Sequence, residues 1–259
     1  MTPSRIAALR AERALLLEMC RGLTDGQWAT PSRAEGWSVQ DVVAHMGAGC
    51  RAIFTVGALE ILRSNDIEKL NDVLVEQRRQ FAPAQVLAEY ERWSLRLIRL
   101  ARIVDASPLS RIRVPLAELG RFPANLLVGS AMVFDHYTHL RHDLAPALGL
   151  APPPSDANAV AVVLEWMLAV LGNQLRVARH SWLTAPIRVN LAGAGGGSWT
   201  VLPDATITAQ SVASAAEITA SAAEFPEWAT RRVEWRKRDV TVSGDTEYAA
   251  TFLDAVNVV

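Results

Sequence analysis

Three histidines and two aspartates lie within the short segment from Val133 to Leu144, and this is the most distinctive chemistry in the sequence. Imidazole nitrogens and carboxylate oxygens are ligands of Zn²⁺ and related divalent metals in proteins. The segment has no Gly or Pro and is flanked by apolar residues, which predicts a helix. At about 100° per residue, Asp135, His139 and His142 fall within about 60° of one another. The spacing therefore predicts a metal-binding face on this helix.

A second face of the same helix offers a rival ligand set. His136, His139 and Asp143 also fall within about 60° of one another. A third interpretation needs no metal, because histidines near the carboxyl end of a helix interact favourably with its negative dipole. His142 and Asp143 fit that structural role best. From these residues alone the alternatives stay open.

A further ligand must come from another element, because catalytic zinc sites typically use three protein ligands and leave one position open. Asp135 and His139, one turn apart, can supply two ligands from one helix. His45 lies on the apolar side of a separate predicted helix and is the expected third ligand. A lone histidine there would more often be a packed core residue, but its coincidence with the cluster favours a ligand. His180, at another predicted helix end, is assigned no chemistry.

The elements that must position these residues are helices. Apolar spacing predicts long helices at residues 3–23, 38–53, 83–102 and 124–148. Ser38, with Asp41 three residues later, predicts a capping box at the start of the second helix. Residues 105–122 show no clear period and are predicted to be a loop. Four long helices joined by polar connections predict an antiparallel bundle.

The stretch Ala151-Pro-Pro-Pro-Ser-Asp156 resembles a linker, because consecutive prolines end a helix and hold an extended spacer. We place the domain boundary there, which gives domains 1–150 and 151–259. The second domain is predicted to be a small α+β domain. Its predicted helices are 158–180, 222–232 and 247–256, and its predicted strands are 186–191, 198–202, 205–209, 217–220 and 239–243. The fold class is therefore two-domain α+β, with an N-terminal antiparallel four-helix bundle.

Composition limits the classes of binding partner and the cellular compartment that we expect. The chain has 259 residues, is half apolar and carries a formal net charge of −1, with both signs interspersed, which excludes nucleic acid and membrane as main partners. Cys20 and Cys50 form no CxxC pattern, so a reducing compartment is expected. The charged amino terminus does not fit a signal peptide, and no later stretch approaches 18 uncharged apolar residues. We expect a cytoplasmic monomer or homodimer.

Two segments carry a family resemblance. The first runs from Trp28 through Gly36-Trp37-Ser38 to His45, and the second runs from Asp135 through His139 to Asp143-Leu144. Both resemble signatures of the mycothiol-dependent maleylpyruvate isomerase family, a branch of the DinB-like metal-binding four-helix bundles. Segments 191–201, 222–232 and 242–256 resemble the family's second domain, which is similar to sterol carrier proteins. The resemblance implies a DinB-like bundle at 1–150 and a sterol-carrier-like α+β domain at 151–259.

Carried over position by position, the resemblance makes His45, Asp135 and His139 the metal ligands. The chain departs from the usual pattern, because the gap between His139 and the Asp-Leu pair is one residue longer. The acidic ligand of the family is also often Glu. His136 or His142 therefore remains an alternative member of the ligand set.

The resemblance also implies a reaction. A divalent metal, Zn²⁺ above others, would bind the low-molecular-weight thiol mycothiol and hold it as a thiolate that adds to a small electrophile. The chain would then be an isomerase or an S-transferase with a small-molecule thiol and an electrophilic substrate as its partners. Arg79 and Arg232 are predicted to hold carboxylates of either partner. The alternatives are a non-catalytic ligand-binding or stress-response protein of the same fold and a thiol-independent metal hydrolase.

Overall fold

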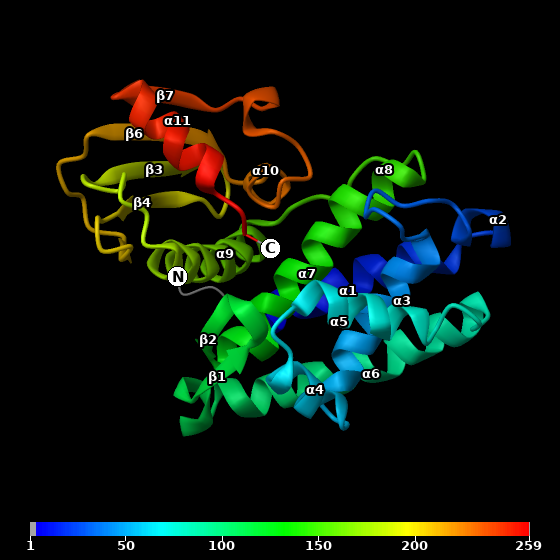
Figure 1. Cartoon of the computed structure of the whole chain (residues 1–259). Helices are drawn as coiled ribbons and strands as arrows, with labels where there is room; N and C mark the ends of the chain where they lie inside the picture. The colour runs from blue at the N-terminus through cyan, green and yellow to red at the C-terminus, as the bar shows by residue number, and fades with distance from the viewer. Residues whose placement is uncertain (1–3, 259) are drawn as a thin grey trace. The chain divides into compact units, whose positions relative to one another are not determined.

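A computed structural model describes residues 4–258, and its chain divides between Pro154 and Ser155 into two compact units. We call residues 4–154 the N-terminal unit and residues 155–258 the C-terminal unit. The first is helical apart from one small hairpin, and the second combines helices with a five-stranded sheet (Figure 1). The predicted two-domain α+β fold class is confirmed. The division falls within the proline-rich segment 151–156.

Long helices dominate the N-terminal unit. α3 packs extensively on α6, while α1 packs on both α6 and α7. The predicted capping box at the start of α3 is confirmed, because Ser38 accepts from the Asp41 amide and Asp41 accepts from the Ser38 amide. The predicted start of the first helix at Pro3 lies outside the described residues. The helices of this unit are α1 (Arg5–Arg21), α2 (Asp25–Trp28), α3 (Val39–Ala52), α4 (Gly57–Arg63), α5 (Ile67–Glu76), α6 (Pro83–Asp105), α7 (Met132–Thr138) and α8 (Ala145–Ala147).

The prediction that residues 105–122 form a loop is wrong. A 3₁₀ turn, η1 (Pro108–Arg111), is followed by an antiparallel hairpin of β1 (Arg113–Leu116) and β2 (Gly120–Pro123), with η2 (Ala117–Leu119) at its tip. Strands of four residues are too short to show a period in the sequence.

The predicted helix at 124–148 exists, but it is not one regular α-helix. It contains two π-helical segments, η3 (Leu126–Ala131) and η4 (His139–Leu144), which flank α7. We call residues 126–147 the π-interrupted helix. A π turn holds an extra residue relative to an α turn, and such turns occur frequently at functional sites. The histidine-rich stretch lies on α7 and η4.

The core of the N-terminal unit brings the long helices together. Apolar side chains from α1, α3, α6 and η4 form one buried cluster, which includes Leu16, Val42, Met46, Tyr90 and Leu140. His45 and His139 lie on two of these helices. The core therefore fixes the elements that carry the predicted ligands.

The C-terminal unit is built on a sheet with the strand order β5-β4-β3-β6-β7, in which β3 and β6 are parallel and the other pairs antiparallel. Ile187, Val189 and Leu191 of β3 are buried, whereas the residues between them are partly exposed, as expected for a sheet covered on one face. α9 packs on β5 and α11 on β6. The elements are α9 (Ala157–Ala178), β3 (Ile187–Ala192), β4 (Gly197–Val201), β5 (Ile207–Thr208), β6 (Ala216–Ser221), α10 (Phe225–Ala229), η5 (Trp235–Lys237), β7 (Thr241–Gly244) and α11 (Thr246–Ala255).

Two elements of this unit are shorter than predicted. The helix predicted at 222–232 is only α10, because Pro226 fits the first turn and Arg231 takes a left-handed φ of 57° just after the helix. The strand predicted at 205–209 is only β5, because Ala205 has a φ of 65° that no strand accommodates.

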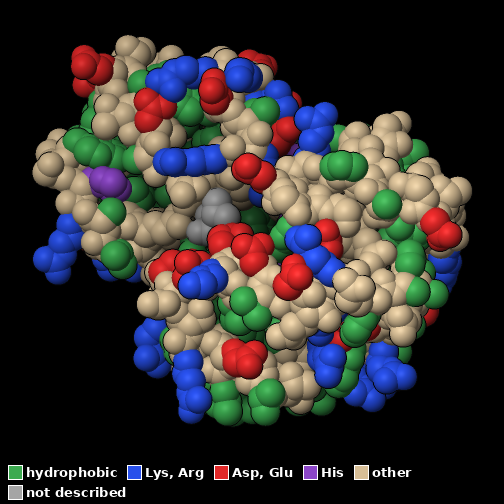
Figure 2. All heavy atoms as spheres, turned by 45° about the vertical axis from the view of Figure 1, so that its right-hand side comes forward, with side chains coloured by type: hydrophobic (Ala, Val, Ile, Leu, Met, Phe, Trp, Pro, Cys, Tyr) green, Lys and Arg blue, Asp and Glu red, His purple; other side chains and the backbone are tan. Residues whose placement is uncertain are grey.

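Within the described chain, α9 is the one helix that is by itself long and apolar enough to cross a membrane. Most of its apolar side chains are buried, as in a core helix of a soluble protein. The face of the molecule in Figure 2 shows Lys and Arg interspersed with Asp and Glu. This mixture agrees with the net charge of −1.

Candidate metal centre

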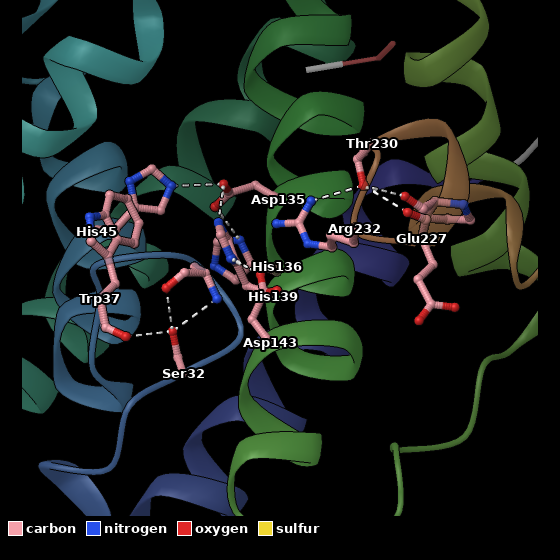
Figure 3. A network of polar contacts seen from close by, with 12 residues as sticks. Ser32, Trp37, His45, Asp135, His136, His139, Asp143, Glu227, Thr230 and Arg232 are labelled. Carbon is pink, nitrogen blue, oxygen red and sulfur yellow. Dashed lines mark hydrogen bonds and ion pairs between the residues drawn. The ribbon is translucent and has the colours of Figure 1, made fainter. Parts of the chain in front are cut away.

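Three helical segments bring the predicted ligands together. His45 comes from α3, Asp135 from α7 and His139 from the first position of η4. One nitrogen or oxygen atom from each of the three side chains lies within 4.8 Å of the others. His45 Nε2 is 3.0 Å and His139 Nε2 is 3.5 Å from the same oxygen, Asp135 Oδ1 (Figure 3). The two imidazoles thus converge on one carboxylate.

A buried carboxylate orients the imidazole of His139. Its Nδ1 donates a hydrogen bond of 2.7 Å to Oδ2 of Asp143, a side chain with no solvent exposure. When His139 is neutral and its proton is on Nδ1, the lone pair is on Nε2, which lies 3.5 Å from Asp135 Oδ1. Carboxylate partners of this kind fix the tautomer of metal-binding histidines.

The electrostatics also suit a cation. Burial raises the pKa of Asp135, but the charges of His45, His139 and His136 and the hydrogen bond from His45 hold it well below its usual range. Burial lowers the pKa of His45, yet Asp135 outweighs that effect and the pKa is raised. Asp135 is therefore an anion that attracts positive charge to this point. A divalent metal would supply that charge in place of a proton.

The residues present fit a divalent metal. Two imidazole nitrogens and one carboxylate oxygen form a donor set of the kind found in catalytic zinc sites. Among residues 4–258, His45 Nδ1 is buried without a hydrogen-bond partner, and the ring contacts Asp135 through Nε2. A ligand set of three leaves room for a further ligand.

The rival ligand set does not assemble in the described part of the chain. His136 Nδ1 donates to the carbonyl of Met132 at 2.7 Å, within its own helix, and Asp143 is bonded to His139. His142 lies beside Tyr137, with ring centroids 6.4 Å apart. The atoms of His136 and His142 are not part of the converging group.

The histidine and the aspartate of the longer spacing both lie in a π-helical segment. His139 begins η4 and Asp143 lies within it, and the two side chains are hydrogen-bonded to each other. A buried ion pair connects η4 to α1. The Arg141 guanidinium of η4 lies 2.6 Å from the Glu12 carboxylate of α1. The same guanidinium lies 3.9 Å from the centre of the Tyr137 ring.

Trp37 is a residue of the centre to which the sequence analysis gave no role. Its ring centroid lies 5.0 Å from that of His45 and 6.3 Å from that of His139. Its Nε1 donates to Oδ1 of Asp72, on α5, at 3.0 Å. Trp37 belongs to the Gly-Trp-Ser signature, and that membership is the sequence feature that could have assigned it to the centre. No sequence pattern predicts its bond to Asp72.

The loop that carries Trp37 is itself braced. Ser32 Oγ donates to the Trp37 carbonyl at 2.8 Å (Figure 3). The Arg33 amide donates to the Asp143 carbonyl. The Arg33 bond therefore connects the loop that precedes α3 to η4.

The two predicted ligand-binding arginines lie in different units. Arg79 makes an ion pair with Glu76 at 2.8 Å and donates to the Gly36 carbonyl at 3.4 Å. Arg232, in the C-terminal unit, donates to Thr230 Oγ1 at 2.9 Å. The roles of both arginines in ligand binding stay predictions.

Comparison with known proteins identifies the N-terminal unit. Residues 9–145 match the family model described as the mycothiol maleylpyruvate isomerase N-terminal domain. The chain belongs to this family. The resemblance predicted from the two signatures is therefore confirmed, and the matched residues include all three converging side chains.

Two solved structures share the fold of this family member. One is the mycothiol-dependent maleylpyruvate isomerase, which is 15% identical with a TM-score of 0.58 and aligns over 92% of this chain and 91% of that chain. The other is a variant of that enzyme with one histidine replaced by alanine, and it gives the same values. No curated protein matches the chain significantly.

Proposed function

We propose that this family member is a metal-dependent enzyme that uses mycothiol, a low-molecular-weight thiol, to act on a small electrophile as an isomerase or S-transferase. The observation that carries the proposal is the convergence of His45 Nε2 and His139 Nε2 on Asp135 inside the family's domain. The name of the two structurally similar enzymes supports the thiol as cosubstrate.

Each residue of the centre has a defined task in this proposal. His45, Asp135 and His139 would be the ligands, and a divalent metal, Zn²⁺ in our proposal, would hold the thiol sulfur as a thiolate at neutral pH. Asp143 keeps the His139 proton on Nδ1, so that Nε2 faces the centre. Trp37 lies beside the two histidines and would limit the access of water from that side.

The chain's own cysteines do not suit the role of nucleophile. Cys20 and Cys50 are both buried and unpaired. Burial raises the pKa of Cys20 to about 12, and burial raises the pKa of Cys50 as well. A thiol that cannot ionise near neutral pH is a poor nucleophile. In the proposed reaction the nucleophilic thiol would therefore come from outside the chain.

The remaining parts of the proposal are predictions made from the sequence. Arg79 and Arg232 are proposed to contact carboxylates of the thiol or the electrophile, and Arg79 would exchange its long bond to the Gly36 carbonyl for such a contact. The C-terminal unit is proposed to be the sterol-carrier-like domain. We propose a cytoplasmic location, which suits two reduced cysteines, and a monomer or homodimer.

Metal analysis of the purified protein tests the proposal. We expect about one equivalent of divalent metal, and we expect its loss in His45→Ala and in His139→Ala. His180→Ala is the matched control, because His180 lies in the C-terminal unit beside Trp182. Mycothiol should then bind the metal-loaded protein and not the metal-free protein, as measured by calorimetry.

Two outcomes would overturn the proposal. One is metal content that is unchanged in both ligand variants. The other is turnover of an ester or amide that needs no thiol, which would instead support a metal hydrolase. Binding of an apolar ligand without thiol-dependent turnover would support the non-catalytic alternative.

A further inference from the structure

The two histidines of the candidate metal centre differ in what restrains their rings. His139 donates from Nδ1 to the buried carboxylate of Asp143 at 2.7 Å. His45 has no such restraint within residues 4–258, because its Nδ1 is buried and makes no hydrogen bond. A histidine that binds a metal through one nitrogen is almost always oriented by a hydrogen bond at the other. His45 therefore lacks the usual means of holding its ring.

Trp37 packs against this ring, as Figure 3 shows. The centroids of the two rings are 5.0 Å apart and their planes are inclined by 44°, within the range of about 4.5–7 Å for packed aromatic pairs. The same indole lies at 28° to the His139 ring, with centroids 6.3 Å apart. The His45 and His139 rings are 5.1 Å from each other. The His45 ring thus has aromatic neighbours in place of a second hydrogen bond.

Trp37 is itself fixed through both its side chain and its backbone. Its Nε1 donates to Oδ1 of Asp72 at 3.0 Å, and a hydrogen bond to a carboxylate is stronger than one between neutral groups. Asp72 lies on α5, which packs against α3, the helix that carries His45. The Trp37 carbonyl accepts from the Ser32 amide and from Ser32 Oγ, both at 2.8 Å. Turning the indole away from His45 would break the bond to Asp72.

We propose that Trp37, held by Asp72, is a positioning residue whose indole fixes the His45 imidazole with Nε2 toward Asp135. The inference rests on the proposed function, because Trp37 would act through a ligand of the proposed metal. The two histidines are then oriented by different means. A carboxylate holds His139 through a hydrogen bond, and an aromatic ring holds His45 through packing.

Replacing the indole tests the proposal on the purified full chain. Trp37→Leu removes the ring beside His45, so we expect the affinity for Zn²⁺ to fall by about 10–100-fold, as when other groups that orient a metal ligand are lost. Trp37→Phe keeps an aromatic ring there and should restore the affinity to within about fivefold of the wild type. A chelator competition titration measures the affinity. The visible absorption of bound Co²⁺ should change shape in Trp37→Leu, because it depends on the arrangement of the ligands.

A second pair of variants tests the bond that holds the indole. Asp72→Leu removes the acceptor and should lower the Zn²⁺ affinity by about three- to tenfold. Asp72→Asn keeps a side-chain oxygen that can accept from Trp37 and should change the affinity by less than about twofold. Both substitutions remove the same exposed charge, so the difference between them measures the hydrogen bond and not the electrostatic attraction of the metal.

Trp235→Leu is the matched control, because Trp235 of the C-terminal unit also donates to a carboxylate, Asp254, at 2.8 Å, and its loss should leave the Zn²⁺ affinity unchanged. Wild-type affinity in Trp37→Leu would overturn the positioning role, and so would equal losses in Trp37→Phe and Trp37→Leu. Should Trp37→Leu fail to fold, the two exposed Asp72 variants decide the question, and equal affinities in them overturn the role. A wild-type protein that binds neither Zn²⁺ nor Co²⁺ is a different result, since it overturns the proposed function and the inference with it.

Discussion

The two units of this chain differ in the kinds of polar side chain that they bury. Within the described residues, every buried ionisable side chain lies in the N-terminal unit, whereas the buried polar residues of the C-terminal unit are Thr200 and Thr230. Burying an ionisable group is costly unless it is paired. The N-terminal unit therefore holds the buried groups whose stability depends on pairing. The buried acidic, basic and histidine residues are Glu12, Asp41, His45, Arg78, His136, His139, Arg141 and Asp143.

The two long helices that follow one another across the boundary show the same contrast. α9 is a regular α-helix of 22 residues with a broad buried apolar face. The π-interrupted helix breaks the regular ladder at η3 and η4 and carries the histidines. Such irregular winding persists only where neighbouring groups hold it. Here Asp143 binds His139, and Glu12 binds Arg141.

The largest effect is expected from breaking the buried ion pair of the N-terminal unit. Arg141→Met leaves Glu12 as an uncompensated charge, because the side chains of the pair are only 3% and 1% exposed. We expect a loss of about 3–5 kcal/mol in the free energy of unfolding. Urea titration followed by far-UV circular dichroism measures this loss.

The C-terminal unit supplies the control for this prediction. Arg236 and Asp254 also form an ion pair of 2.6 Å, but their side chains are 55% and 51% exposed. Arg236→Ala should therefore leave the urea midpoint unchanged. The double change Glu12→Leu with Arg141→Met should recover much of the lost stability, because no charge remains buried. Equal effects of Arg141→Met and Arg236→Ala would break the contrast between the units.

Features with a local signal could be predicted from the sequence. The long helices follow from apolar periodicity, and the start of α3 follows from the Ser38 and Asp41 capping pair. Helical spacing also brought Asp135 and His139 onto one face. His45 was added because it was the one histidine on an apolar face of another predicted helix.

Features that depend on distant contacts could not be predicted. Glu12 and Arg141 are 129 positions apart, and Trp37 and Asp72 are 35 positions apart, so no local pattern joins them. The π winding of η4 is another feature without a local signal, because helical spacing in a sequence is calculated for a regular α-helix.

The second prediction concerns Asp143, which acts on the centre through His139. Asp143→Asn weakens the bond that holds the His139 tautomer, so metal affinity should fall by about 10–100-fold while the protein stays folded. A chelator competition titration measures the affinity. Asp239→Asn, at an exposed position of the C-terminal unit, should not change it. Unchanged affinity in Asp143→Asn would show that η4 alone orients the imidazole.

The smallest effect comes from a matched pair of glycines in the two contrasting helices. A Cβ on Gly172 of α9 would lie 3.5 Å from the Ala205 carbonyl oxygen, which is an ordinary contact. Gly172→Ala should therefore stabilise the protein by about 0.5–1 kcal/mol, because Ala loses less backbone entropy in a helix.

A Cβ on Gly129 of η3 would instead lie 2.8 Å from Cδ of Arg5. Arg5 cannot move freely, because its guanidinium donates to Ser130 at 2.9 Å and to Asp105 at 2.9 Å. Gly129→Ala should therefore give no gain or a loss of about 1 kcal/mol, measured by the same urea titration. An equal gain from both substitutions would mean that Arg5 moves without cost, and that η3 is no more constrained by its neighbours than the regular turns of α9.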